Sequence, residues 1–291
     1  MTFRCSQQRW RKNKNIYGYS IGPLSIMTIA LNATDHEDLC HGWSWTVEDE
    51  DVLAERVARI ALGQARHVAR IIDGLTTKPA RTTAEHAADA IKKLAPDANG
   101  ETYRRDGWLF QSISWIAAHQ NRKGAILRAP HIRKADHGFD GLQIEFSRDG
   151  STVTSVMIFE DKATTNPRDT IRDEVWPGIA ALEAGQRVTE LTHDVTSVLE
   201  AYQAVMPLDV EDAVAEILWK ETRTYRVSIT IGDTHAVHAA RAGLFAGYND
   251  HAPGLVAKRR AETIYFPNMR TWMGNFATKI EAKIHEIAAH V

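Results

Sequence analysis

Residues 137–169 read HGFDGLQIEFSRDGSTVTSVMIFEDKATTNPRD, and this stretch decides both the expected fold and the candidate chemistry. GLQIEF alternates in polarity and TVTSVMIFE becomes almost wholly apolar, so both segments are predicted strands, and SRDGS between them is typical of a hairpin turn. The apolar run ends directly at Glu160, Asp161 and Lys162. Charges at the end of a buried strand are costly to desolvate, so they either lie in solvent or converge on a compensating group.

Antiparallel geometry brings a fourth charge to this place. In a hairpin, the start of the first strand lies beside the end of the second, so we expect Asp140 to lie close to Glu160. Side chains alternate along a strand, so Glu160 and Lys162 share one face while Asp161 points to the other. Two carboxylates and the main-chain carbonyl of Asp161 form a set of hard oxygen donors that suits Mg²⁺ or Mn²⁺. A neighbouring lysine would position water and stabilise charge on a phosphate.

A plainer interpretation has to be weighed against this one. A Glu-x-Lys pair is common at exposed strand ends, where such ion pairs contribute little. Three features favour a functional site: the apolar strand that leads into the charges, the glycine-flanked Asp140, and the arginine-containing helix that follows, with Arg168 and Arg172.

GFDG followed at twenty residues by VMIFEDKA resembles the core signature of the PD-(D/E)XK nuclease superfamily, over roughly residues 105–185. The resemblance implies a restriction-endonuclease-like fold and a Mg²⁺-dependent or Mn²⁺-dependent phosphodiesterase. It makes Asp140 the acid of the second motif, Glu160 the acid of the third, and Lys162 the lysine of the third. Asp161 would contribute its carbonyl to the metal.

The chain departs from the superfamily pattern at one position. The superfamily commonly places a further acid on the preceding core helix, but Gln111 stands where a glutamate is expected. A glutamine can still supply a carbonyl oxygen, so weaker metal binding and lost activity are both open. The superfamily often adds a basic residue on the helix after the third motif, which makes Arg168 and Arg172 candidate phosphate-binding residues.

The rest of the chain predicts an α/β protein, with a mixed sheet flanked by helices. Amphipathic helices are expected at residues 48–72, 83–94 and 106–121, and more strands and helices follow the hairpin. The linker-like APDANG places a boundary near residue 100, which divides the chain into an N-terminal mainly helical region (1–100) and a nuclease-like domain (101–291).

Composition narrows the function classes. The chain has 291 residues, 25% of them charged, and a formal net charge of -2, so it is neither a disordered tail nor a globally basic nucleic-acid coat. Two cysteines without zinc or disulfide spacing, and no unbroken apolar span, predict a soluble cytoplasmic protein. The chain lacks a phosphate-binding P-loop, a dinucleotide fingerprint and a serine-nucleophile elbow.

We therefore expect a metal-dependent nuclease, acting on DNA rather than RNA, in phage defence, restriction or repair. Because phosphate contacts supply most non-specific affinity, a nearly neutral chain would need a confined basic groove, a protein partner or a homodimer. Two alternatives remain open. One is a catalytically inactive nucleic-acid-binding or assembly subunit with the same fold, and the other is an α/β enzyme using Glu160 and Lys162 as an acid/base pair on a small substrate.

Overall fold

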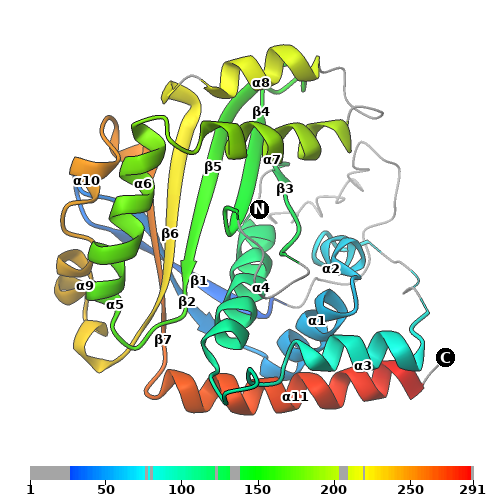
Figure 1. The fold of residues 1–291 in the computed structure, drawn as a ribbon. Helices are drawn as coiled ribbons and strands as arrows, with labels where there is room; N and C mark the ends of the chain where they lie inside the picture. The colour runs from blue at the N-terminus through cyan, green and yellow to red at the C-terminus, as the bar shows by residue number, and fades with distance from the viewer. Residues whose placement is uncertain are drawn as a thin grey trace, which may run out of the picture.

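The computed structural model describes residues 27–75, 78, 81–121, 124–131, 138–202, 209–218 and 220–289. Within these ranges the architecture is mixed α/β, with one seven-stranded sheet whose order is β1-β2-β7-β6-β5-β4-β3 (Figure 1). The strands are β1 (Ile29–Asp35), β2 (His41–Val47), β3 (Ile126–Leu127), β4 (Gly141–Phe146), β5 (Val153–Lys162), β6 (Arg223–Ile231) and β7 (Arg259–Tyr265).

The pairing directions divide the sheet into a parallel centre and two antiparallel edges. Strands β2, β7, β6 and β5 are parallel neighbours, whereas β1 pairs with β2, and β4 with β5 and β3, in antiparallel fashion. Parallel strands buried on both faces read as apolar runs, which explains the buried apolar residues 156–159 of β5. The predicted mixed sheet flanked by helices is confirmed at this level.

Two hydrophobic cores cover opposite faces of the sheet. The helices are α1 (Glu50–Ala61), α2 (Ala65–Ile72), α3 (Ala84–Lys92), α4 (Tyr103–Asn121), α5 (Pro167–Thr170), α6 (Trp176–Glu183), α7 (Val188–Glu200), α8 (Val210–Leu218), α9 (His238–Leu244), α10 (Tyr248–His251) and α11 (Met269–Ala289). One core contains residues of α1, α2, α3, α4 and α11, together with Met157 and Phe159 of β5. The other core contains residues of α6, α7, α8 and α10, together with Val156 and Ile158 of the same strand. Alternate residues of β5 therefore belong to different helical layers.

The boundary expected near residue 100 does not separate two structural units. Strand β2 pairs in parallel with β7, from His41 opposite Arg260 to Trp45 opposite Ile264. Helix α1 packs against α11, and both belong to the core that contains α4. The N-terminal part thus adds an edge hairpin and a helical layer to the same sheet, so the mainly helical description of residues 1–100 is incomplete.

The single helix expected at residues 48–72 is two helices. Asp49 caps α1 by accepting a hydrogen bond from the Val52 amide at 2.9 Å, as its position before the apolar repeat predicts. Gly63 has φ +75°, a left-handed conformation that ends α1, and α2 then begins at Ala65. A continuous apolar repeat did not reveal this break, because the two helices keep their apolar faces toward the same core.

The helix expected after the hairpin is interrupted by a π-helical turn. A π-helical turn (Ile171–Val175) joins α5 to α6, and Pro177 stands in the first turn of α6. This turn places Glu174 beside Lys162. Among the described helices, none is both long and apolar enough to cross a membrane.

Candidate active site

The strand ends place Asp140 and Glu160 next to each other. The β4–β5 register pairs Gly141 with Phe159, which sets Asp140 opposite Glu160 at the next position. The Asp161 amide donates a hydrogen bond to Asp140 Oδ2 at 2.7 Å. The hairpin geometry predicted from the sequence is therefore confirmed.

Gly141 allows the two strands to meet at this point. A Cβ atom at position 141 would lie 2.7 Å from the Phe159 ring, closer than real Cβ contacts allow. Any larger residue would displace either Phe159 or the strand end that carries Asp140. The glycine that follows Asp140 in GFDG therefore has a packing function.

Glu160 and Lys162 point toward the helical layer of α6 and α7. Lys162 Nζ lies 3.9 Å from Glu160 Oε2 and 3.6 Å from Glu174 Oε2. The Lys162 side chain is 27% exposed and that of Glu160 is 15% exposed, so both can be reached from solvent. These ion pairs are too long to be hydrogen bonds, and the ammonium group keeps donors for another partner.

Asp161 points to the opposite face and is buried under α4. Its carboxylate accepts a hydrogen bond from Ser114 Oγ at 2.7 Å, and Ser114 Oγ in turn accepts from Arg226 at 2.9 Å. Arg226 also pairs with buried Glu262 at 2.7 Å. The Asp161 carboxylate thus belongs to a buried polar network that crosses from β5 to β7.

Gln111 reaches the cluster from α4, as expected for the core helix. Its Nε2 donates a hydrogen bond to Asp140 Oδ1. With the Asp161 amide on Oδ2, both oxygens of Asp140 are oriented by donors. A glutamine at position 111 therefore holds the Asp140 carboxylate, whereas a glutamate in the same place would repel it.

Arg187 is a cation of this cluster that sequence reasoning missed. It lies just before α7, with Nη1 3.6 Å from Glu160 Oε1 and its guanidinium 4.2 Å from the centre of the Phe139 ring. Its fork also pairs with Glu190 at 2.9 Å. An arginine in a turn carries no sequence pattern, so only the packing of α7 against the hairpin reveals it.

The two arginines expected to bind phosphate lie elsewhere. Arg168 donates from Nη1 to the carbonyls of Leu244 and Ala246, at 2.9 and 3.0 Å, and so ties α5 to the segment after α9. Arg172 is 55% exposed and pairs with Asp169 and Asp173. Neither makes a described contact with Asp140, Glu160 or Lys162, and their phosphate-binding role stays a prediction.

Burial and mutual repulsion make the carboxylates weak acids. Burial and the Asp140 charge raise the pKa of Glu160 to about 7. Burial, with the Asp140 charge adding to it, likewise raises the pKa of Asp161 to about 7, and burial raises the pKa of Asp140. Burial alone would lower the pKa of Lys162, but Glu160, Asp140 and Glu174 outweigh it and raise this pKa.

The donor set fits a divalent cation in its chemistry. The N–H and C=O of one strand residue lie on the same edge of the strand, so the Asp161 carbonyl faces the Asp140 side, past the end of β4. Asp140, Glu160 and this carbonyl are hard oxygen donors. In the described part of the chain, no three histidine, cysteine or acidic side chains form a metal-binding group, and this set contains only two such side chains.

The sequence matches no protein-family model and no curated protein. The site is therefore interpreted from its own geometry.

We expect Glu160→Gln to stabilise the protein in the presence of a chelator at pH 8. A carboxyl pKa raised in the folded state means that folding binds protons, so the free energy of unfolding falls as pH rises from about 4 to 7. Glutamine removes this cost, and we expect a gain of about 1 to 2 kcal/mol. The measurement is urea unfolding at two pH values. The gain in the free energy of unfolding should be present at pH 8 and absent at pH 4. Glu200→Gln, on the exposed face of α7, is the control and should leave the free energy of unfolding unchanged at both pH values. An equal loss of stability at both pH values in Glu160→Gln would contradict a raised pKa for Glu160.

Proposed function

We propose that this chain is a metal-dependent nuclease of the PD-(D/E)XK superfamily, with a restriction-endonuclease-like fold. The observation that carries the proposal is the convergence of Asp140, Glu160 and Lys162 at the ends of two paired antiparallel strands. Gln111, on the helix that precedes the hairpin, completes the cluster. Acids, a lysine and an amide meeting at one strand end support hydrolysis of a phosphodiester better than they support a solvated surface pair.

Each side chain has a distinct part in this proposal. Asp140, Glu160 and the Asp161 carbonyl would hold Mg²⁺ or Mn²⁺, which supplies charge stabilisation for the reacting phosphate when bound. Hydrolysis forms a bond from a water oxygen to phosphorus, breaks one phosphorus–oxygen bond and builds negative charge on the phosphate oxygens. Lys162 would donate hydrogen bonds to the attacking water and to a phosphate oxygen. Gln111 would orient Asp140.

Partial exposure of the cluster favours a large substrate over a small enclosed one. Glu160 and Lys162 are reachable from solvent, and neither the cavity between α2 and α7 nor the cavity beside α5 is lined by Asp140, Glu160 or Lys162. A nucleic-acid strand can lie across an open strand end, whereas a small metabolite needs to be enclosed. We propose DNA as the preferred substrate, with affinity supplied by local cations such as Arg187, and with defence or repair as the biological setting.

The experiment that tests this function is cleavage of end-labelled linear duplex DNA, circular DNA, single-stranded DNA and RNA, each with Mg²⁺, Mn²⁺ or a chelator. We expect cleavage of at least one substrate, abolished by the chelator and by Glu160→Ala. Salt-sensitive binding without cleavage under every condition would contradict the nuclease and favour the inactive binding subunit, an outcome that Gln111 in place of an acid would explain.

Gln111→Glu tests whether Gln111 belongs to the cation site. It replaces a donor to Asp140 by a third carboxylate, so we expect lower stability in chelator and about tenfold tighter Mn²⁺ binding, because more negative charge surrounds the ion. Calorimetric titration of Mn²⁺ measures the affinity, and thermal unfolding measures the stability. Gln120→Glu, two and a half turns along the same helix, is the matched control for Mn²⁺ affinity; it also loses a donor, because Gln120 Nε2 donates to the Ile29 carbonyl. Unchanged Mn²⁺ affinity in Gln111→Glu would place Gln111 outside the cation site.

A further inference from the structure

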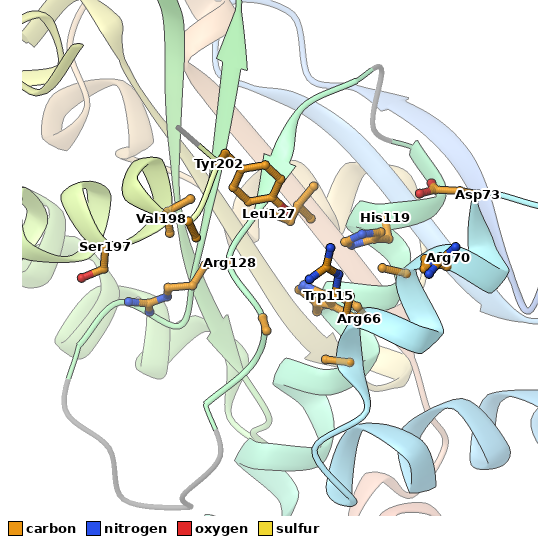
Figure 2. A pocket seen from close by; sticks show the side chains of 14 residues that line it. Arg66, Arg70, Asp73, Trp115, His119, Leu127, Arg128, Ser197, Val198 and Tyr202 are labelled. Atoms are coloured by element: carbon orange, nitrogen blue, oxygen red, sulfur yellow. The ribbon is translucent and has the colours of Figure 1, made fainter. Parts of the chain in front are cut away.

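A pocket of about 560 Å³ lies between α2, α4, the end of β3 and α7 (Figure 2). Arg66, Arg70, Trp115, His119, Arg128 and Tyr202 are among its lining residues. A cavity of this size matches one small organic ligand, and most of such a ligand's surface would be buried in it. None of the residues of the candidate active site lines it.

Helix α4 links this pocket to the active site. Gln111, Trp115 and His119 follow each other at intervals of four residues, so they form one stripe along α4, with about 6 Å between successive positions. Gln111 holds Asp140, and the next two residues of the stripe line the pocket. A second link runs through Arg128, which lines the pocket and donates to the Phe139 carbonyl, one residue before Asp140.

The walls offer aromatic surfaces. The rings of Trp115 and His119 lie 4.2 Å apart between centroids, on a wall where the two residues are 5% and 4% exposed, and Tyr202 is 37% exposed on another wall. Figure 2 shows Tyr202 and the Trp115–His119 pair on different sides of the cavity. Aromatic side chains around a cavity provide flat apolar faces that suit a planar ring, and nucleic-acid bases stack on such side chains.

Helix α2 adds positive charge at the rim. Arg66 and Arg70 are one turn apart, and within the described residues neither forms an ion pair with an acid. Arg66 is exposed, so its fork is able to turn to an anion in the mouth of the pocket. An arginine fork matches the geometry of phosphate oxygens. Asp73, at the end of the same helix, is the acidic lining residue.

We propose that this pocket binds one nucleoside monophosphate unit, with its base between Tyr202 and the Trp115–His119 wall and its phosphate on Arg66 and Arg70. The assignment rests on the pocket itself and stands whether or not the neighbouring cluster cleaves a phosphodiester. The same chemistry is available from a free nucleotide or from a nucleotide of a bound strand, since the α4 stripe places the two sites side by side.

The test is calorimetric titration of the full chain with AMP, GMP, CMP, UMP and dTMP, in chelator so that no cation is bound at the carboxylates. We expect at least one of them to bind with a dissociation constant below about 1 mM. Arg66→Ala/Arg70→Ala should weaken that binding about tenfold or more, and Tyr202→Ala should also weaken it. Arg148→Ala, an exposed arginine in the β4–β5 turn, is the matched control and should have no effect. Glu160→Gln should also bind like the wild type, which separates this pocket from the candidate active site.

Competition with a trinucleotide distinguishes a free nucleotide from a nucleotide of a bound strand as the ligand of this pocket. Tighter binding of the trinucleotide, with displacement of the monophosphate, assigns the pocket to a strand, whereas a monophosphate that the trinucleotide does not displace is a free ligand. Either result supports the assignment. It is overturned if no monophosphate binds up to about 5 mM, or if Arg66→Ala/Arg70→Ala binds as tightly as the wild type while remaining folded.

Discussion

Lys162→Ala is expected to lower the rate of phosphodiester cleavage by about 10²- to 10⁴-fold and to leave nucleic-acid binding nearly unchanged. Lys162 Nζ lies 3.9 Å from Glu160 Oε2, so the proposal places its ammonium group next to a phosphate bound at the carboxylates. The negative charge on the phosphate oxygens is larger in the transition state than in the bound substrate, so Lys162 would stabilise the transition state more. Its removal therefore affects the rate more than binding.

A second effect of Lys162 has to be separated from this one. Its charge opposes the rise in the pKa of Glu160, so Lys162→Ala also makes Glu160 harder to ionise. If that were its whole contribution, raising the pH would restore the rate of Lys162→Ala. We expect the loss to persist at pH 9, measured as single-turnover cleavage across the pH range. Lys92→Ala, an exposed lysine on α3, is the matched control, and a Lys162→Ala rate equal to the wild type would remove Lys162 from the chemistry.

Arg226→Met is expected to lower the free energy of unfolding by about 3 to 5 kcal/mol. The Arg226 side chain is 1% exposed and pairs with the Glu262 carboxylate, which also accepts a hydrogen bond from the Trp45 indole at 2.9 Å. Removing the guanidinium leaves the buried Glu262 carboxylate with the Trp45 indole and with Arg260, whose Nε lies 3.9 Å away, too far for a hydrogen bond. It also removes the donor to Ser114, the residue that holds Asp161.

The measurement is urea unfolding followed by circular dichroism, with Arg172→Ala as the control. Arg172 pairs only with exposed acids, so its removal should leave the midpoint unchanged. Where Arg226→Met is too unstable to study, Arg226→Met/Glu262→Gln should recover part of the loss, because the buried charge at position 262 is then removed together with its partner. If Arg226→Met were as stable as the wild type, the buried network of Arg226, Glu262 and Ser114 would contribute nothing to the stability of the fold.

Local signals in the sequence were sufficient for the hairpin and its charges. The turn SRDGS sets the register of β4 and β5, and the register alone determines that Asp140 and Glu160 are neighbours. Period-two alternation likewise separates Asp161 from Glu160 and Lys162. Gln111 was found through the resemblance to the PD-(D/E)XK superfamily, which commonly places an acid on the core helix before the hairpin.

Pairings between distant segments could not be predicted in the same way. Strand β2 lies beside β7, more than 200 residues later, and no local pattern states which strands become neighbours. The sequence of β6 indicates a strand, but alternation does not say that Arg226 faces a buried layer under α4 and not solvent. Arg187 entered the site through the packing of α7. The sequence therefore predicted the acids and the lysine of the cluster, while its remaining cation and its buried support depended on tertiary structure.

Binding of Mn²⁺ at pH 8 tests the central claim most directly, because it does not depend on finding the right nucleic acid. At this pH the Glu160 carboxylate, whose pKa is raised to about 7, is largely ionised and able to hold a cation. Calorimetric titration should show Mn²⁺ binding in the wild type that weakens at least about tenfold in Glu160→Gln and in Asp140→Asn, but not in Glu200→Gln. Absence of binding in the wild type, or equal binding in all four proteins, would contradict a cation-dependent site at Asp140 and Glu160.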